Sequence, residues 1–400
     1  MSTAPDVATH VPLAEPAHPA VGAATTLMAD YRPGARFLGT PTRTLVGHGV
    51  HSEVPHDERP LGERVADTLA RAKAQGHHAP VMGAIAFDHT APAALAIPDR
   101  VRTAPPLAAD PLIALPADAP EDVDWQLRQV PAPEEYGAGV AAAVERMWRG
   151  EFSKVVLART LELTAPEPLD LPAMLQRLAR RDPNGYTFAL PTAPGRTLIG
   201  ASPELLVSRH GTRVVANPLA GSTPRSDDLA EDVRRAAALL ESAKDLHEHA
   251  VVVDAVHQAL APYCAELVVP AGPTLIRTAT MWHLSTTVTG TLASPATSAL
   301  DLGLALHPTP AVCGTPTPLA REVIRETEPF DRGFFTGMIG WGDASGDGEW
   351  VVTIRCAEAE ERSLRLYAGA GVVAASEPEA ETRETAAKFR TFLAAVGARL

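Results

Sequence analysis

Cysteine is scarce in this sequence, whose 400 residues include only Cys264, Cys313 and Cys356. No two of them are spaced as a CxxC pair, which argues against a disulfide framework and a zinc knuckle. The first residues lack a basic segment followed by an apolar one, and no uncharged apolar run is long enough to span a bilayer. We therefore expect a soluble, cytoplasmic protein with buried, reduced thiols.

Basic residues are also few. Lysine and arginine total 35 against 48 aspartates and glutamates, which gives a formal net charge of −13. This balance argues against nucleic acid or an anionic membrane as the main partner, because both are negatively charged. It is compatible with a local cationic pocket for an anionic small molecule. Apolar residues make up 46% of the chain, enough for a sizeable core.

The N-terminal third carries the weaker signals. Residues 1–25 are rich in Ala, Pro and Thr and lack periodicity, which predicts a mobile tail. Short apolar runs alternate with turn residues over 37–87. Residues 88–134 contain nine prolines, and we interpret them as a long ordered connector. No repeat at solenoid spacing is present.

From Pro133 onward the patterns sharpen. Residues 134–149 and 226–261 have helical composition, as do residues 377–396, which follow a capping-box spacing from Ser376 to Glu379. Strand-like runs cover residues 152–159, 196–201, 204–208, 213–216, 349–356 and 363–367. Clustered strands separated by long helices predict a mixed α/β fold with antiparallel pairing.

Two single residues could perform acid–base chemistry. Strand alternation places Lys154 on one face with Phe152 and Val156, where an ammonium loses hydration and could serve as a general base. Glu204 begins an apolar strand after a Ser-Pro turn, and a carboxyl in apolar surroundings can be a proton donor. Taken singly, each is more often a solvated strand residue.

Charged residues recur at three- and four-residue spacing on two predicted helices, so they share a helix side. They are Glu241, Lys244, Asp245 and Glu248 on the first helix, and Glu381, Glu384 and Lys388 on the last. Such patterns usually mean exposed, salt-bridged faces. The functional alternative is one carboxylate from each helix converging on a hard cation such as magnesium, which prefers oxygen ligands.

Glycine-rich stretches and one arginine complete the candidates. Residues 219–222 and 368–371 predict turns whose backbone N–H groups could bind an anion, although neither matches a nucleotide-binding loop. Arg355 alternates with Ile354 on a predicted strand and could hold a carboxylate with two hydrogen bonds. A structural ion pair is an equally good interpretation of this arginine.

Taken in order, these features resemble the chorismate-utilising enzymes, a family that includes isochorismate, salicylate, anthranilate and aminodeoxychorismate synthases. The resemblance covers residues 130–400, and the N-terminal third follows the family pattern loosely. Its motifs are Lys154-Val-Val-Leu-Ala-Arg159, Ala201-Ser-Pro-Glu-Leu205, Pro218-Leu-Ala-Gly-Ser222, Lys244-Asp-Leu-His-Glu-His249, His307-Pro-Thr-Pro310, Ile354-Arg-Cys356, Tyr367-Ala-Gly-Ala-Gly371 and Glu381-Thr-Arg-Glu-Thr-Ala-Ala-Lys388. Several motifs in the family order are far more specific than any one of them.

The resemblance implies a role for each matching position. Glu248 and Glu384 resemble the magnesium ligands, Lys154 the base that activates water, and Glu204 the acid that protonates the departing hydroxyl. The residues that resemble the substrate-binding set are Gly221, Ser222, His283, Ala311, Arg355, Tyr367, Gly369 and Lys388, with His307 as a further lining residue. The implied fold is one large α/β domain over residues 26–400, with two packed antiparallel sheets and helices outside.

Lys154 also bears on the subgroup. Members of this family that use ammonia commonly have glutamine where the lysine stands, so water is the implied nucleophile and the implied activity is isochorismate or salicylate synthesis. Ser222, where members with lyase activity more often show threonine, favours isochorismate release, and the pattern around residues 307–311 is most similar to siderophore-type isochorismate synthases. A menaquinone-pathway enzyme and a non-catalytic chorismate-binding subunit stay open. We expect a monomer that binds chorismate and isochorismate, with an isochorismatase as a pathway partner.

Overall fold

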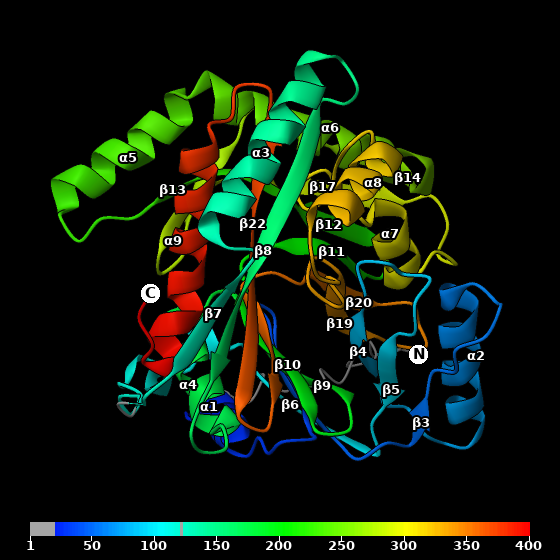
Figure 1. Cartoon of the computed structure of the whole chain (residues 1–400). Helices are drawn as coiled ribbons and strands as arrows, with labels where there is room; N and C mark the ends of the chain where they lie inside the picture. Colours follow the sequence, from blue (N-terminus) through cyan, green and yellow to red (C-terminus); the bar gives the residue numbers. More distant parts are fainter. Residues whose placement is uncertain (1–20, 121–122) are drawn as a thin grey trace, which may run out of the picture.

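The computed structural model describes residues 21–120 and 123–400. Within them the strands form three sheets, and every strand pairing is antiparallel. Two large sheets pack face to face and helices cover their outer faces (Figure 1). This agrees with the predicted fold class and adds a third, small sheet that the sequence did not predict. None of the described helices is both long enough and apolar enough to cross a membrane.

The larger sheet has ten strands. Its order is β18-β8-β22-β21-β10-β9-β1-β2-β6, with β7 also paired to β8. The strand bounds are β1 (Arg36–Gly39), β2 (Thr44–His48), β6 (Arg100–Ala104), β7 (Gln126–Val130), β8 (Lys154–Thr164), β9 (Tyr186–Ala193), β10 (Arg196–Ser202), β18 (Gly314–Thr315), β21 (Cys356–Glu360) and β22 (Ser363–Val373).

The second sheet has nine strands in the order β14-β17-β12-β11-β20-β19-β4-β5-β3, and the third has the order β13-β16-β15. The bounds in the second sheet are β3 (Ser52–Glu53), β4 (Val81–Ile85), β5 (Ala94–Ile97), β11 (Leu205–His210), β12 (Arg213–Asn217), β14 (Cys264–Val268), β17 (Val288–Leu292), β19 (Met338–Gly342) and β20 (Gly348–Val352). Those in the third are β13 (Leu219–Pro224), β15 (Thr274–Arg277) and β16 (Met281–Ser285).

Helices fill the outer layers. They are α1 (Ala23–Ala29), α2 (Leu61–Ala74), α3 (Pro133–Trp148), α4 (Leu171–Arg181), α5 (Leu229–Glu241), α6 (Ala243–Leu260), α7 (Ala299–Leu306), α8 (Thr317–Thr327) and α9 (Pro378–Val396), with short 3-10 turns η1 (Leu107–Ala109), η2 (Pro111–Ala114) and η3 (Ala261–Tyr263). One apolar cluster joins α1, α4 and α9 to the ten-stranded sheet, and another joins α2, α6 and α7 to the nine-stranded sheet.

The core between the two large sheets is built from strands that face each other. Phe188 and Leu198 come from the ten-stranded sheet, and Ile339 and Val351 from the nine-stranded sheet. All four side chains are fully buried. Burial of this kind stabilises by about 25 cal/mol per Å² of apolar surface. The rigid sandwich it creates holds the loops and strand ends from which the pocket described below is built.

Two expectations about the N-terminal third need correction. Residues 1–20 of the predicted tail lie outside the described residues, but residues 23–25 belong to α1, where Ala24 and Thr25 are buried. The proline-rich segment 88–134 contains β5, β6 and β7 and is not simply a connector. Its prolines fall between the strands, where the missing N–H breaks no ladder, so they mark strand ends and leave the strands intact.

Two predicted helical features also differ. Residues 226–261 form two helices, because Ser242 leaves the helical conformation and its Oγ accepts a hydrogen bond from Asp245 N at the start of α6. The capping box at Ser376 does not form. Ser376 Oγ instead accepts a hydrogen bond from Val373 N, and α9 begins with Pro378 in its first turn.

Candidate active site

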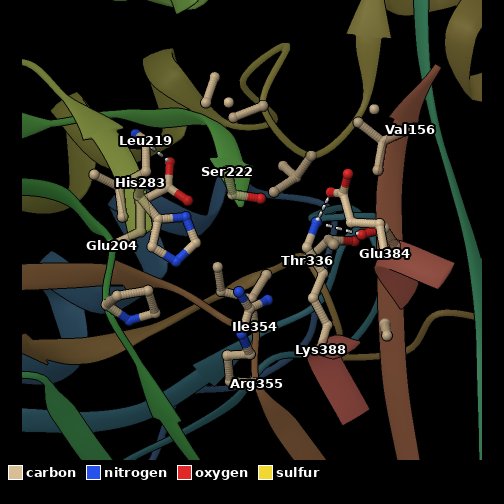
Figure 2. Close-up of a pocket in the computed structure, with 18 of the residues that line it drawn as sticks. Val156, Glu204, Leu219, Ser222, His283, Thr336, Ile354, Arg355, Glu384 and Lys388 are labelled. Atoms are coloured by element: carbon tan, nitrogen blue, oxygen red, sulfur yellow. Dashed lines mark hydrogen bonds and ion pairs between the residues drawn. The ribbon is translucent and has the colours of Figure 1, made fainter. Parts of the chain in front are cut away.

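A pocket lies where the ends of both large sheets meet the small sheet and helices α6 and α9. It gathers nearly all the predicted site residues, which are far apart in sequence: Glu204, Gly221, Ser222, Glu248, His283, Ala311, Arg355, Tyr367, Gly369, Glu384 and Lys388. Figure 2 shows Glu204 and His283 on one side, Glu384 and Lys388 on the other, and Arg355 between them. Lys154 does not line the cavity itself.

Lys154 lies directly behind the pocket lining, at the start of β8. Its side chain is 3% exposed, and Nζ donates a hydrogen bond to Glu248 Oε1 at 2.8 Å. The predicted burial is therefore present, but the ammonium is paired and not isolated among apolar groups. Gly371 on the neighbouring strand β22 makes room for this contact, since a Cβ there would lie 2.5 Å from Glu248 Oε1.

Glu204 is fixed by the turn that precedes β11. Ser202 Oγ donates to Val352 O at 2.7 Å and accepts from Glu204 N at 3.3 Å, which pins the Ser-Pro-Glu turn to β20. The carboxyl is 3% exposed, and its Oε1 accepts only a long hydrogen bond from Leu219 N, at 3.4 Å. Burial raises the pKa of Glu204 to about 7, although the charges of Lys154, Arg355 and Lys388 oppose the shift. At neutral pH a substantial fraction of the Glu204 carboxyl is therefore protonated and can donate a proton.

Glu248 and Glu384 enter the pocket from α6 and α9, and both are paired with lysines. Lys388 Nζ lies 2.6 Å from Glu384 Oε1, one turn along the same helix. Burial acts to raise the pKa of Glu248, but the charge and hydrogen bond of Lys154 outweigh it, so this pKa lies below its usual range. Two carboxylates on separate helices thus face one cavity.

The donor chemistry of these carboxylates fits a magnesium ion. In the described residues no group of three or more His, Cys, Asp or Glu side chains is placed to hold a metal. Magnesium commonly takes one or two protein carboxylates and completes its shell with waters and substrate oxygens. Glu248 and Glu384 match that pattern, whereas they would be too few for a closed, all-protein metal site.

Arg355 lines the pocket with a guanidinium that lacks one of its hydrogen-bond partners. It lies in the bend between β20 and β21 with φ 51°, and not within a strand as predicted. Its buried Nη2 has no hydrogen-bond partner. Burial lowers the pKa of Arg355 to about 10, against the opposing effect of Glu384 and Glu204. The guanidinium stays charged at neutral pH and is free to bind an anion.

His283 on β16 is the second unsatisfied group. The side chain is buried and its Nε2 has no hydrogen-bond partner. Burial, reinforced by the charges of Arg355 and Lys388, holds the pKa of His283 well below 6.5, so the imidazole is neutral. Ser222 is its strand partner on β13. A neutral imidazole can exchange hydrogen bonds with a hydroxyl or an ether oxygen.

The two glycine-rich stretches are strand segments and not the predicted turns. Gly221 lies at an irregularity in β13 with φ 78°, a conformation that favours glycine, and a Cβ there would lie 3.1 Å from Asp245 Cβ. Gly369 is within β22, and its carbonyl accepts a hydrogen bond from Lys388 Nζ at 2.8 Å. This second bond fixes the Lys388 ammonium at the pocket wall.

Besides Lys154, three of the predicted residues lie outside the pocket lining. His307 is buried outside the pocket lining, where Nε2 is 3.0 Å from Phe87 O, so it supports the fold near a loop. Glu241 ends α5 and does not share a helix with Glu248, because the chain breaks at Ser242. Glu381 is buried beneath the lining and pairs with Lys244.

One wall of the pocket is apolar. Phe335 stacks on Tyr367 with ring centroids 5.0 Å apart, and Ala311, Val312 and Ile354 line the same cavity. Thr336, which has φ 58°, is a lining residue that sequence reasoning missed. The glycines that flank Phe334-Phe335-Thr336 are the only sequence signal, and they predict a turn without indicating where it lies.

The sequence motif around Glu248 also contains a histidine that supports the pocket. His249 is buried, with Nδ1 at 3.1 Å from Ala220 O and Nε2 at 2.7 Å from Thr286 Oγ1. These contacts tie α6 to the β13 segment that carries Gly221 and Ser222. The histidine therefore supports the pocket from outside it.

The fold and the pocket together define a class of protein: a mixed α/β enzyme whose pocket holds a buried acid, two metal-compatible carboxylates and an arginine with an unpaired nitrogen for an anionic small molecule. Comparison with known proteins identifies the family. Residues 112–397 match the family model described as "Chorismate binding enzyme", and the chain belongs to this family.

Several relatives are similar over nearly the whole chain. Isochorismate synthase DhbC of Bacillus subtilis is 55% identical over 383 residues, which cover 93% of this chain and 96% of the relative. The vibriobactin-specific isochorismate synthase of Vibrio cholerae is 43% identical over 91% of this chain and 92% of its own. A crystal structure of DhbC from Bacillus anthracis superposes with a TM-score of 0.88 at 49% identity, covering 94% of this chain and 100% of that one.

Proposed function

We propose that this protein is a magnesium-dependent isochorismate synthase that supplies isochorismate for a catecholate siderophore. The observation that carries the proposal is the placement of a buried acid, Glu204, in the pocket of a chorismate-binding enzyme, with a buried lysine, Lys154, directly behind the pocket lining. Two similar synthases are named as specific for vibriobactin and for 2,3-dihydroxybenzoate, and these names support the siderophore assignment.

Chorismate carries two carboxylates, and the pocket offers cations for them. Arg355 has a buried nitrogen without a partner, and Lys388 is held at the wall by Gly369 O. The substrate's apolar ring edge fits against the stacked pair Phe335 and Tyr367. Binding would satisfy groups that the free protein leaves unpaired, and an unpaired buried group costs about 1–3 kcal/mol.

The proposed chemistry exchanges one hydroxyl for another. A water attacks ring carbon C2 and gives its proton to Lys154, the ring double bonds shift, and the C4–O bond breaks. Glu204 donates a proton to the departing oxygen, which leaves as water. One water enters and one leaves, so product and substrate are isomers. Lys154 accepts a proton only once it is neutral and no longer held by Glu248, which makes exchange of that contact part of the proposal.

Magnesium would be held by Glu248 and Glu384 together with a substrate carboxylate. When bound, it supplies positive charge that orients the substrate and stabilises charge developing at its oxygens. The carboxylates that hold it are the same ones that Lys154 and Lys388 contact in the structure. Occupation of the metal site and release of the lysines are therefore linked.

Product identification tests the proposal directly. Purified protein is incubated with chorismate and magnesium, and products are separated by chromatography, with pyruvate followed in a lactate dehydrogenase-coupled assay. Isochorismate with little pyruvate is expected near neutral pH, and isochorismate added alone should return some chorismate. Salicylate and pyruvate formed in step with chorismate loss would overturn the assignment in favour of salicylate synthase, and no turnover would favour a non-catalytic subunit.

The apolar wall is expected to set the product. Pyruvate elimination from isochorismate is an intramolecular rearrangement, so the protein influences it mainly by holding or refusing the reactive conformer. Tyr367 and Ile354 line the ring side of the pocket and are the positions to vary. We further propose that the protein acts as a cytoplasmic monomer whose product passes to an isochorismatase.

A further inference from the structure

An ion pair lies one helical turn away from the two carboxylates assigned to the metal. Lys244 Nζ donates to Glu381 Oε1 at 3.1 Å. Lys244 precedes Glu248 by four residues in α6, and Glu381 precedes Glu384 by three residues in α9. Residues at these spacings share a helix face. Each member of the pair is therefore the neighbour of one metal carboxylate.

The two helices belong to different parts of the fold. Helix α6 packs on β13 of the small sheet and against α7, whereas α9 packs mainly on β22 of the ten-stranded sheet. Both helices touch β13 of the small sheet, but α9 does so only lightly, so this shared strand does little to fix the separation between Glu248 and Glu384. The Lys244–Glu381 hydrogen bond crosses that separation and joins α6 to α9 directly.

Burial makes the pair asymmetric. Glu381 is 1% exposed, whereas the Lys244 side chain is 39% exposed and lies at the pocket edge. Burial and the charge of Glu384 raise the pKa of Glu381, and Lys244 opposes the shift. Without Lys244, a buried carboxylate beside Glu384 would lose its main compensating charge and would protonate or move, which disturbs its neighbour.

We propose that Lys244 and Glu381 are positioning residues that set the spacing of Glu248 and Glu384 and thereby the affinity for the divalent cation. The inference rests on the proposed function, in which these two carboxylates bind the ion. The Lys244 ammonium is committed to Glu381, so its contribution falls on the metal and not on chorismate. Neither residue needs to touch the reacting atoms.

Manganese is the probe, because its paramagnetic resonance signal reports free and bound ion without turnover. Lys244→Met should raise the Kd for Mn²⁺ by about 10- to 100-fold, the range typical for loss of a residue that supports metal ligands from outside the coordination shell. The Kd for chorismate in metal-free protein should change less than about twofold. Lys244→Arg should restore most of the metal affinity. In the double variant Lys244→Met/Glu381→Gln, the loss of Mn²⁺ affinity should be no larger than in whichever single variant binds Mn²⁺ more weakly.

A matched control breaks another ion pair between helices. Arg146 of α3 bonds Glu326 of α8 at 2.9 Å on the surface, and Glu326→Gln should leave the Mn²⁺ affinity unchanged. Circular dichroism establishes that each variant is folded. Should Lys244→Met not fold, Glu381→Gln and Lys244→Arg give the same test, since the first must weaken Mn²⁺ binding and the second must preserve it.

Several outcomes would overturn the inference: an unchanged Kd for Mn²⁺ in folded Lys244→Met or Glu381→Gln, additive losses in the double variant, or a matching loss of chorismate affinity. Glu384→Gln separates this failure from that of the proposed metal site. If Glu384→Gln leaves Mn²⁺ binding intact, the metal assignment itself is wrong. If it abolishes binding while Lys244→Met has no effect, only the positioning role fails.

Discussion

The two sides of the pocket differ in how far their polar and charged groups have partners. On the helix side, Lys154 pairs with Glu248 and Lys388 pairs with Glu384. On the sheet side, Arg355 and His283 each have a buried nitrogen without a partner, and Glu204 accepts one long hydrogen bond. Buried polar groups are ordinarily satisfied, so the unpaired side is a sign of a ligand site.

The difference indicates what each side must do when ligands bind. The sheet side gains partners, because substrate oxygens can reach groups that the free protein leaves unsatisfied. The helix side must exchange partners, because a cation at Glu248 and Glu384 competes with the lysines that already bind them. The proposed role of Lys154 as the base depends on that exchange, since the lysine lies behind the lining with its ammonium held by Glu248.

Removal of the metal should have the largest effect. Treatment with EDTA is expected to reduce chorismate turnover to background, and excess magnesium should restore it. The reason is that the bound metal would supply the positive charge that orients the substrate carboxylate beside Glu248 and Glu384. Consumption of chorismate is followed by chromatography. Full activity in a rigorously metal-free assay would rule out the metal role of these carboxylates.

Loss of the acid should come next. Glu204→Gln is expected to lower kcat by about 100- to 10,000-fold while chorismate still binds. The proposed mechanism needs Glu204 protonated. Because burial raises the pKa of Glu204 to about 7, kcat should fall as pH rises through 7, at about tenfold per unit beyond it. The residual rate of Glu204→Gln should lack this decline. Near-native kcat in the variant would remove Glu204 from the mechanism.

Replacement of the buried lysine tests the paired side in the same assay. Lys154→Ala is expected to lose at least about 100-fold in kcat. It also leaves the half-buried Glu248 carboxylate without its ammonium partner, so the unfolding temperature should fall, which is not expected for Glu204→Gln. A Lys154→Ala protein with native kcat would show that another group activates the water.

The smallest expected effects are on the free energy of unfolding. Substitutions on the two sides of the pocket should change it in opposite directions. Arg355→Met removes a desolvated charge that has no partner at Nη2, so the free protein should be as stable or more stable by about 1 kcal/mol, although chorismate binding weakens. Lys388→Met leaves Glu384 unpaired and should cost about 1 kcal/mol. Thermal unfolding without ligands measures both. Equal destabilisation by the two variants would contradict the distinction between the sides.

Much of the architecture and of the pocket could be predicted from the sequence. The apolar alternation of residues 152–159 predicted a strand with Lys154 on a buried face, and the spacing of Glu384 and Lys388 predicted a shared helix side that the structure shows as a 2.6 Å contact. These are local consequences of a two-residue period in strands and a 3.6-residue period in helices. The ordered motifs then indicated the family, to which residues 112–397 belong.

Tertiary structure decided which of these residues come into contact and which protonation state Glu204 has. Lys154 and Glu248 are 94 residues apart, and their contact depends on how α6 docks beside β8 and β22. The strands in 88–134 exist because β6 pairs with β2 and β7 with β8, partners that no local pattern names. Arg355 lies in a bend with positive φ and not in a strand for the same reason. Local sequence fixes periodicity, whereas register and docking depend on long-range packing, and burial, which sets the protonation of Glu204, follows from that packing alone.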